Sequence, residues 1–368
     1  MCLEGILISF NTAAIAAIVP AVGRSLFIPE SQASRIIPYY MIPYGFGALL
    51  YAPLLKYFAP KPIKLITLFL FTIFCLFCGS AYYLNVLLFS RVFAGLAAAA
   101  VIPLTLVIIG QAVPKENRGR MVGWFFSLTF IASITGVFLS GILPWRWLFF
   151  IPAVLGLLTT GLVFFFFPDD LPKLAGLKTN YFQLLLKKEI VGVFAFIFLV
   201  SLIYHASYNW LGVYLERVYR LEQMGISMFL TLIGLSGACG QVLGGFMTDR
   251  KGRVASAYFG LIILSVSIML LAAKLPAGIL ALVFVLFGIG WTVNHNALAT
   301  LLTDFPDKYR AEVSSLNSAV RFISGGLGVA LSGLFIEKNF ANSYLGFGII
   351  LIVLSIFVNY LLKEPVKL

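Results

Sequence analysis

Apolar segments of about 20 residues, separated by short charged or proline-containing stretches, follow one another along the whole chain. A helix of about 20 apolar residues is long enough to cross the hydrocarbon core of a bilayer. Because a spanning segment must satisfy its own backbone polar groups, only helices and closed barrels cross lipid. The apolar residues do not alternate with polar ones, as barrel strands would require. The sequence therefore predicts an all-α membrane protein.

Composition excludes a soluble fold. Of the 368 residues, 61% are hydrophobic and 11% are charged, whereas a soluble domain carries about 25% charged residues. The net charge is +12, but the sequence has no basic, aromatic-rich face outside the apolar segments. We therefore expect lysines and arginines beside membrane lipid and no nucleic-acid partner.

Twelve spans are predicted, in two groups of six. The polar stretch 168–188 separates the groups. We therefore predict an N-terminal six-helix bundle over 1–167, a cytoplasmic linker over 168–188 and a C-terminal six-helix bundle over 189–368. The predicted spans are 3–22, 36–56, 63–83, 86–112, 121–143, 147–167, 189–214, 225–248, 254–273, 277–301, 311–335 and 342–362.

The loops carry an asymmetric positive charge. With the N-terminus inside, 17 lysines and arginines fall on the cytoplasmic side and 7 on the outer side, while Arg91 and Arg321 lie within spans. Cytoplasmic loops are enriched in these residues. We therefore predict a multi-pass protein of the cell (inner or plasma) membrane with both termini in the cytoplasm.

The two halves resemble each other. The hexapeptide Gly136-Val-Phe-Leu-Ser-Gly141 returns as Gly328-Val-Ala-Leu-Ser-Gly333, 192 residues later. Two further residues, which lie just before the fifth span, repeat at the same distance before the eleventh span: Pro114 and Arg118 return as Pro306 and Arg310. These matches indicate a six-plus-six duplication, which in transporters encloses a substrate path near the bilayer midplane.

The loop after the eighth span reads Gly245-Phe-Met-Thr-Asp249-Arg250-Lys-Gly252-Arg253. Glycine lets helices approach closely, so Gly245 is expected to pack against a neighbour, Asp249 to pair with basic groups and Gly252 to form a tight turn. The segment resembles the G-x-L-x-D-R-x-G-R loop of the major facilitator superfamily. The resemblance implies that these residues latch one conformation of a transporter and release another.

Other segments resemble drug and metabolite exporters of that superfamily, which are often antiporters. They are Arg91-Val-Phe-Ala-Gly95, Trp145-Arg146-Trp147-Leu148-Phe149, and a first span in which Asn11 stands where an aspartate is common. Two features depart from the family. The fifth span lacks the glycine-proline pair of the antiporter signature. In the equivalent loop of the first half, Ala52 replaces the first glycine of the motif, Lys56 replaces its aspartate and Ala59 replaces its second glycine.

Polar residues inside spans are costly and are functional candidates. Arg321 lies about 15 Å along its span, near the midplane, where it could bind an anionic substrate or bond to neighbouring helices. Each histidine, His205 and His295, could carry a proton or serve as a satisfied polar group. We expect the substrate site among Arg321, Asn11, His205, Asn209, Trp291, Asn294 and Arg91.

Thirteen of the 14 acidic residues fall at predicted loops or helix ends, and Glu4 lies just inside the first span. Proton-coupled exporters commonly use a carboxylate in mid-membrane, so two hypotheses stay open. One is efflux of a small organic solute, with coupling to protons. The other is transport or exchange of an organic anion through Arg321, with a counter-anion. We find no metal-ligand spacing, nucleophile motif or phosphate loop, and expect a monomeric transporter without cofactors rather than an enzyme.

Overall fold

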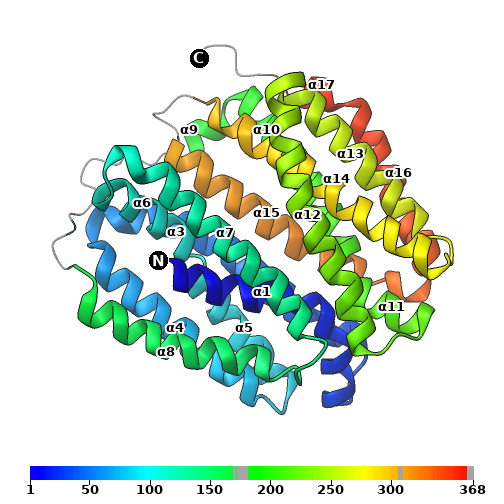
Figure 1. Cartoon of the computed structure of the whole chain (residues 1–368), viewed down its shortest axis with the longest axis horizontal. Coiled ribbons are helices and arrows are strands. Elements are labelled where there is room, and N and C mark those ends of the chain that lie inside the picture. The colour runs from blue at the N-terminus through cyan, green and yellow to red at the C-terminus, as the bar shows by residue number, and fades with distance from the viewer. Residues whose placement is uncertain (169–170, 172–180, 306–309, 363–368) are drawn as a thin grey trace. The chain divides into compact units, whose positions relative to one another are not determined.

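The computed structural model of the chain describes residues 1–168, 171, 181–305 and 310–362. Over these residues the backbone forms helices and turns, without a strand. Two compact units are present, Met1–Thr179 and Asn180–Leu368, and Figure 1 shows the helices of each. Most of the predicted linker 168–188 lies outside the described residues.

The first unit is built around α1, which packs along α7, while α4 packs against both α5 and α8. The α3 helix packs against α5. Its elements are α1 (Cys2–Leu26), α2 (Glu30–Ala33), η1 (Ser34–Ile36), α3 (Pro38–Tyr57), α4 (Pro60–Ser80), α5 (Leu84–Ala98), α6 (Val101–Ala112), α7 (Lys115–Leu139) and α8 (Trp147–Phe166).

The second unit repeats this plan. The α14 helix packs between α12 and α13, and α10 packs along α15. Its elements are α9 (Tyr181–Leu185), α10 (Lys188–Tyr208), α11 (Leu211–Tyr219), α12 (Gln223–Lys251), α13 (Arg253–Leu270), α14 (Ala277–Thr303), α15 (Arg310–Ser332), η3 (Ile336–Lys338), α16 (Phe340–Ile356) and α17 (Val358–Leu361).

Each of the twelve predicted spans falls on a helix. Within the described residues, nine helical stretches are long and apolar enough to cross a membrane, two of which, Leu84–Ala112 and Ile190–Tyr219, continue across a short break; α16 is a shorter apolar helix. Short breaks divide the predicted spans 86–112 and 189–214, after Ala98 and after Tyr208. The fifth span begins at Lys115, six residues before its predicted start. The prediction of an all-α membrane protein is confirmed.

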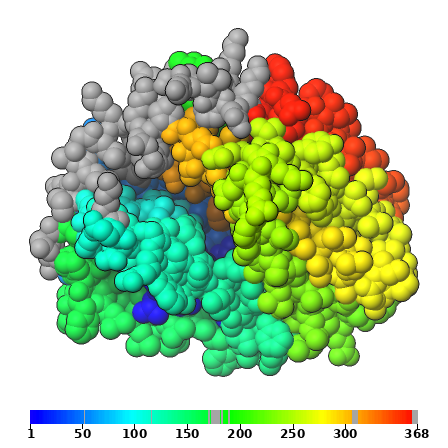
Figure 2. Space-filling view, turned by 45° about the horizontal axis from the view of Figure 1, so that its top comes forward, coloured from blue at the N-terminus to red at the C-terminus, as the bar shows by residue number. Residues whose placement is uncertain are grey.

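Large apolar side chains cover the outer surface of the helices. Phe165 is 77% exposed, Phe166 79% and Ile356 73%. The space-filling view shows α7, cyan to teal, on the surface of its unit (Figure 2), and α7 is the least buried of the nine spans. In water such a surface would aggregate, whereas in a bilayer it faces lipid.

Glycines set the closest helix contacts, at equivalent places in the two units. A Cβ on Gly95 of α5 would overlap the carbonyl oxygen of Tyr40 on α3. In the second unit a Cβ on Gly288 of α14 would overlap the carbonyl oxygen of Ile233 on α12. Both members of the second pair lie 193 residues after their counterparts in the first. Backbones approach this closely only where a side chain is absent.

Candidate functional site

An aromatic and imidazole cluster joins α10 to α14 inside the second unit. The rings of Tyr204 and Trp291 stack with centroids 3.5 Å apart and planes 8° from parallel. His205 lies edge-on to Trp291 at 6.1 Å. His295, one turn after Trp291, lies 5.6 Å from it. The structure thus brings together His205 and Trp291, two of the residues predicted for the substrate site.

Two further rings extend this wall. Tyr208 stacks on Tyr204 with centroids 5.5 Å apart, and Phe287 lies 5.6 Å from Tyr204. Tyr208 follows Tyr204 by one helical turn, and Trp291 follows Phe287 by one turn. Residues four apart share a helix face, so each helix presents two rings to the other.

Arg321 reaches this wall from α15. Its Cζ lies 6.0 Å from the ring centroid of Trp291. Its Nε donates to Oδ1 of Asn317, one turn earlier, at 2.8 Å. The backbone is fixed as well, because the hydroxyl of Ser201 on α10 donates to the Arg321 carbonyl oxygen at 3.1 Å. Arg321 is therefore held in place at its base while its guanidinium points beyond α15.

The far end of the Arg321 guanidinium is unsatisfied. The side chain is 9% exposed, and its Nη2 is buried without a hydrogen-bond partner. No carboxylate of the described residues forms an ion pair with it. A buried, unpaired donor costs about 1–3 kcal/mol, and more when it is charged. Arg321 therefore presents a charged donor that the described protein leaves open.

Asn209 orients His205. The Asn209 Nδ2 donates to the backbone carbonyl of His205 at 3.1 Å and lies 3.1 Å from the ring Nδ1. Because the carbonyl bond requires a donor at that amide position, Nδ1 accepts and the imidazole carries its proton on Nε2. Asn209 lies in the break between α10 and α11. It sets the tautomer and the ring plane of His205.

Asn294 is turned toward another helix. Its Nδ2 donates to the carbonyl oxygen of Ala257 on α13 at 2.7 Å, and the side chain is fully buried. Its bond therefore ties α14 to α13, and the structure does not direct its amide nitrogen toward the aromatic wall. The neighbouring Asn296 faces α12, where its Nδ2 donates to Oε1 of Gln241 at 3.0 Å.

The first unit holds a second cluster, centred on Arg91 of α5. The Nη1 of Arg91 donates to Oδ1 of Asn11 at 3.0 Å, and its Nε donates to the Ile36 carbonyl oxygen at 3.0 Å. The guanidinium lies over the ring of Tyr40, with Cζ 4.0 Å from the centroid. Asn11 in turn donates to the Leu148 carbonyl oxygen at 3.0 Å. The structure therefore brings the two predicted residues Asn11 and Arg91 together.

The two membrane arginines differ in one respect. Arg91 is 1% exposed, and none of its nitrogens is among the buried, unpartnered polar atoms of the described residues. Its bonds connect α1, η1 and α5, and Asn11 extends them to α8. Arg91 is thus a helix-joining residue in this structure, whereas Arg321 keeps a nitrogen without a partner.

Several residues of these clusters escaped the sequence analysis. Tyr204, Tyr40 and Asn317 lie one turn or one contact from a predicted residue, but aromatic and amide side chains are common in membrane helices. The spacing of Asn317 and Arg321, one helical turn apart, was a usable signal.

Glu4 and Lys64 form a buried ion pair between α1 and α4. The partner of Glu4 could not be found from spacing, because the two residues lie 60 positions apart.

The glycine-rich loop after α12 takes the sharp turn that its sequence predicts. Gly252 has φ 86°, in the region that disfavours a side chain, and it alone separates α12 from α13. In the first unit the equivalent residue, Ala59, has φ −67° and is followed by Pro60 at the start of α4. This turn is made without a left-handed residue, which explains why alanine can replace glycine there.

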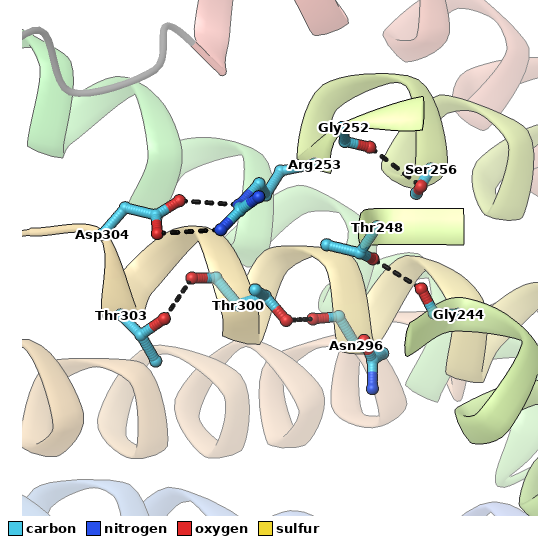
Figure 3. A network of polar contacts seen from close by, with 9 residues as sticks. All are labelled: Gly244, Thr248, Gly252, Arg253, Ser256, Asn296, Thr300, Thr303 and Asp304. Atoms are coloured by element: carbon cyan, nitrogen blue, oxygen red, sulfur yellow. Dashed lines mark hydrogen bonds and ion pairs between the residues drawn. The ribbon is translucent and has the colours of Figure 1, made fainter. Parts of the chain in front are cut away.

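Arg253 anchors this turn to the end of α14. Its Nε lies 2.8 Å from Oδ2 of Asp304 and its Nη2 lies 3.1 Å from Oδ1, as Figure 3 shows. Each side chain of this two-bond pair is about one-third exposed. Nearby, Thr248 donates to the Gly244 carbonyl oxygen within α12. The pair fixes the loop against its own unit.

The packing role predicted for Gly245 belongs to Gly244. A Cβ on Gly245 would meet no described atom within 4 Å, whereas one on Gly244 would lie 3.1 Å from the Cβ of Asn296 on α14. Asp249 is exposed and takes part in none of the ion pairs between described residues. Arg250 lies over the ring of Phe246, 5.7 Å from its centroid.

No group of three histidine, cysteine, aspartate or glutamate side chains that could hold a metal ion occurs among residues 1–168, 171, 181–305 and 310–362. The chemistry of the two clusters is that of non-covalent binding, through aromatic faces, imidazole, amide groups and one open guanidinium nitrogen.

Bilayer-length helices that bury open polar groups define a polytopic membrane protein. The sequence-family model of the Major Facilitator Superfamily matches residues 1–329. The chain therefore belongs to that superfamily. Its family and fold are those of transporters of small molecules, not of enzymes.

Relatives and solved structures agree with this family. YwfA, an MFS-type transporter of Bacillus subtilis, is 27% identical over 336 residues, which cover 87% of this chain and 80% of the relative. Multidrug resistance protein 3 of Bacillus subtilis is 22% identical, over 82% of this chain and 72% of the relative. The nucleoside transporter NupG has the same fold, with a TM-score of 0.80 at 13% identity over 98% of this chain and 97% of its own. A D-xylose-proton symporter gives 0.79 at 16% identity over 99% of this chain and 96% of its own.

Proposed function

We propose that this chain is a secondary active transporter that exports a small organic solute, a drug or metabolite, by alternating access. The observation that carries the proposal is the cluster of Tyr204, Trp291 and Arg321, where an aromatic wall lies beside an open charged donor inside the helices. The relative named Multidrug resistance protein 3 supports export. The protein acts as a monomer in the cell membrane, with both termini in the cytoplasm.

The cluster suits reversible binding of an organic molecule. Aromatic faces offer dispersion and stacking contacts, worth about 0.5–1.5 kcal/mol beyond area burial for each aromatic pair. The imidazole of His205 and the guanidinium of Arg321 offer directional donors. A few such polar groups on an apolar wall are the usual makeup of a small-molecule site.

The segment from Gly245 to Arg253, which comprises the end of α12, Gly252 and the first residue of α13, forms the latch of the second unit in this proposal. Arg253 already pairs with Asp304, so the loop has a fixed shape. Asp249 and Arg250 lie exposed at the end of α12, where they can exchange partners between conformations. Gly252 supplies the turn that follows these two residues.

The cluster of the second unit allows two forms of energy coupling. A proton antiporter would use His205, whose ring stands in the wall and is oriented by Asn209. An organic-anion exchanger would use Arg321 and a counter-anion. The open Nη2 of Arg321 favours the second form.

Reconstitution with substitution of the wall tests the proposal. The purified chain in proteoliposomes is screened by thermal shift against organic cations, neutral solutes and organic anions, and each ligand that raises the melting temperature is assayed for uptake with and without a pH gradient. We expect uptake to fall at least tenfold in Trp291→Ala. The matched control is Trp147→Ala on α8, whose ring is 53% exposed and which should transport like the wild type. Equal loss in both variants, or uptake unchanged in Trp291→Ala, would contradict the proposed site.

A further inference from the structure

We infer that the transported solute is a monoanionic aromatic acid, whose acid group binds Nη2 of Arg321 while its ring lies against the partly exposed rings of Trp291 and Tyr208. The inference rests on the proposed function and names its substrate class. Its starting point is the one nitrogen of Arg321 that is buried without a partner.

The protein bonds Nε of this guanidinium and leaves Nη2 without a partner. Asn317 accepts from Nε at 2.8 Å, which fixes the plane of the group and its direction from α15. A carboxylate or sulfonate oxygen accepts well from a guanidinium, and such charge-assisted bonds are about twice as strong as neutral ones. A ligand of this kind supplies what the described chain does not, because no described carboxylate pairs with Arg321.

Arg91 shows how the same residue type is satisfied when its role is structural. Two hydrogen bonds, to Asn11 and to the Ile36 carbonyl, and the ring of Tyr40 surround its guanidinium. Arg321 lacks such an enclosure, although it too is largely buried. A membrane arginine with an open donor costs stability when the site is empty, and an anion removes this cost.

The aromatic part of the ligand follows from the distance between the charge and the wall. Arg321 Cζ lies 6.0 Å from the Trp291 centroid, so an acid group bonded to Nη2 carries its attached ring toward the rings of α10 and α14. Trp291 and Tyr208 are partly exposed, which leaves ring surface for contact. An organic cation at the same place would meet the positive charge of Arg321 at close range and would be repelled.

A matched set of bicyclic aromatics tests the inference: 2-naphthoate, its neutral amide 2-naphthamide, and the cation N-methylquinolinium. Binding to the purified full chain is measured by calorimetry, and transport by counterflow in proteoliposomes. We expect the wild type to bind naphthoate roughly 10- to 100-fold more tightly than naphthamide. Arg321→Gln should lose this preference while its naphthamide affinity stays within about threefold. Asn317→Ala should lose part of it.

Arg220→Gln is the control, because it removes the same charge from an exposed residue of the same unit. It should behave as the wild type. A wild type that binds naphthoate no more tightly than naphthamide would overturn the inference, and this comparison needs no variant to fold. Transport of the cation or of neutral solutes without naphthoate would overturn the substrate class but leave the proposed function standing. Absence of counterflow for every solute that the thermal-shift screen identifies would overturn the proposed function itself.

Discussion

Gly136 on α7 packs directly against the carbonyl oxygen of Phe10 on α1. The same contact recurs in the second unit, where Gly328 on α15 packs against the carbonyl oxygen of Leu202 on α10. Both residues of the second pair lie 192 positions after their counterparts. The duplication seen in the hexapeptides is therefore a duplication of helix packing within each unit.

This packing predicts a selective cost for added methyl groups. A Cβ at Gly136 or Gly328 would overlap backbone that cannot move aside, so alanine at either position should destabilise the chain by about 1–3 kcal/mol. Thermal unfolding in detergent measures the effect. Gly346→Ala on α16 is the control, because its Cβ would meet no described atom within 4 Å and alanine favours the helix. A melting temperature lowered equally by all three substitutions would refute the packing argument.

The bond between Arg91 and Asn11 predicts the effect of two substitutions. Asn11→Ala leaves a buried guanidinium nitrogen without its acceptor and should cost about 1–3 kcal/mol. Asn11→Asp loses the donor to the Leu148 carbonyl oxygen, as alanine does, but it keeps an acceptor and adds a charge opposite Arg91, so it should cost less than alanine. Thermal unfolding of both variants separates hydrogen-bond loss from a general sensitivity of the site. Equal destabilisation by alanine and aspartate would show that Arg91 does not depend on this acceptor.

Glu4 and Lys64 predict a strongly non-additive pair. Both side chains are at most 2% exposed, so Glu4→Leu or Lys64→Met alone would leave a buried charge unpaired, at a cost of about 3–5 kcal/mol. The double variant removes both charges and should be far more stable than the sum of the singles implies. A double-mutant cycle on the free energy of unfolding gives the coupling. A coupling below about 0.5 kcal/mol would mean that the two charges do not stabilise each other.

The turn at Gly252 predicts backbone strain on substitution. Alanine at φ 86° and ψ 165°, a region used almost only by glycine, should cost about 1–3 kcal/mol. It should also disturb the pair of Arg253 with Asp304 that follows the turn. Gly278→Ala on α14 provides the comparison, since neither space nor a positive φ restricts that position. Thermal stability and transport are measured on both, and a Gly252→Ala chain that matches Gly278→Ala in both would argue against a latch at this loop.

Length and apolarity were sufficient to predict the helices, because a span must be both long and apolar whatever its neighbours are. They do not give the rotation of a helix. Neighbouring residues on a helix point about 100° apart, so the contact expected of Gly245 is made by Gly244 instead. For the same reason the side chain of Asn294 bonds to α13, whereas the sequence suggested the substrate path.

The sequence predicts which polar residues belong to the clusters, but not which residues they contact. Arg91 and Arg321 are both visible as charges within spans, but only the fold shows that Asn11, 80 positions away, accepts from Arg91. In the second unit the amide that bonds to Arg321 is that of Asn317, four residues away on the same helix, and it accepts from Nε while Nη2 has no partner. The distinction between a helix-joining arginine and an open one thus arises from tertiary contacts.

Counterflow in proteoliposomes tests the central claim, that the chain transports an organic solute bound at Trp291 and Arg321, most directly. Liposomes preloaded with unlabelled 2-naphthoate should accumulate labelled solute transiently above equilibrium when they contain the wild type, Trp147→Ala or Arg220→Gln. Liposomes with Trp291→Ala or Arg321→Gln should lose this overshoot. An overshoot of equal size in all five preparations would contradict the account.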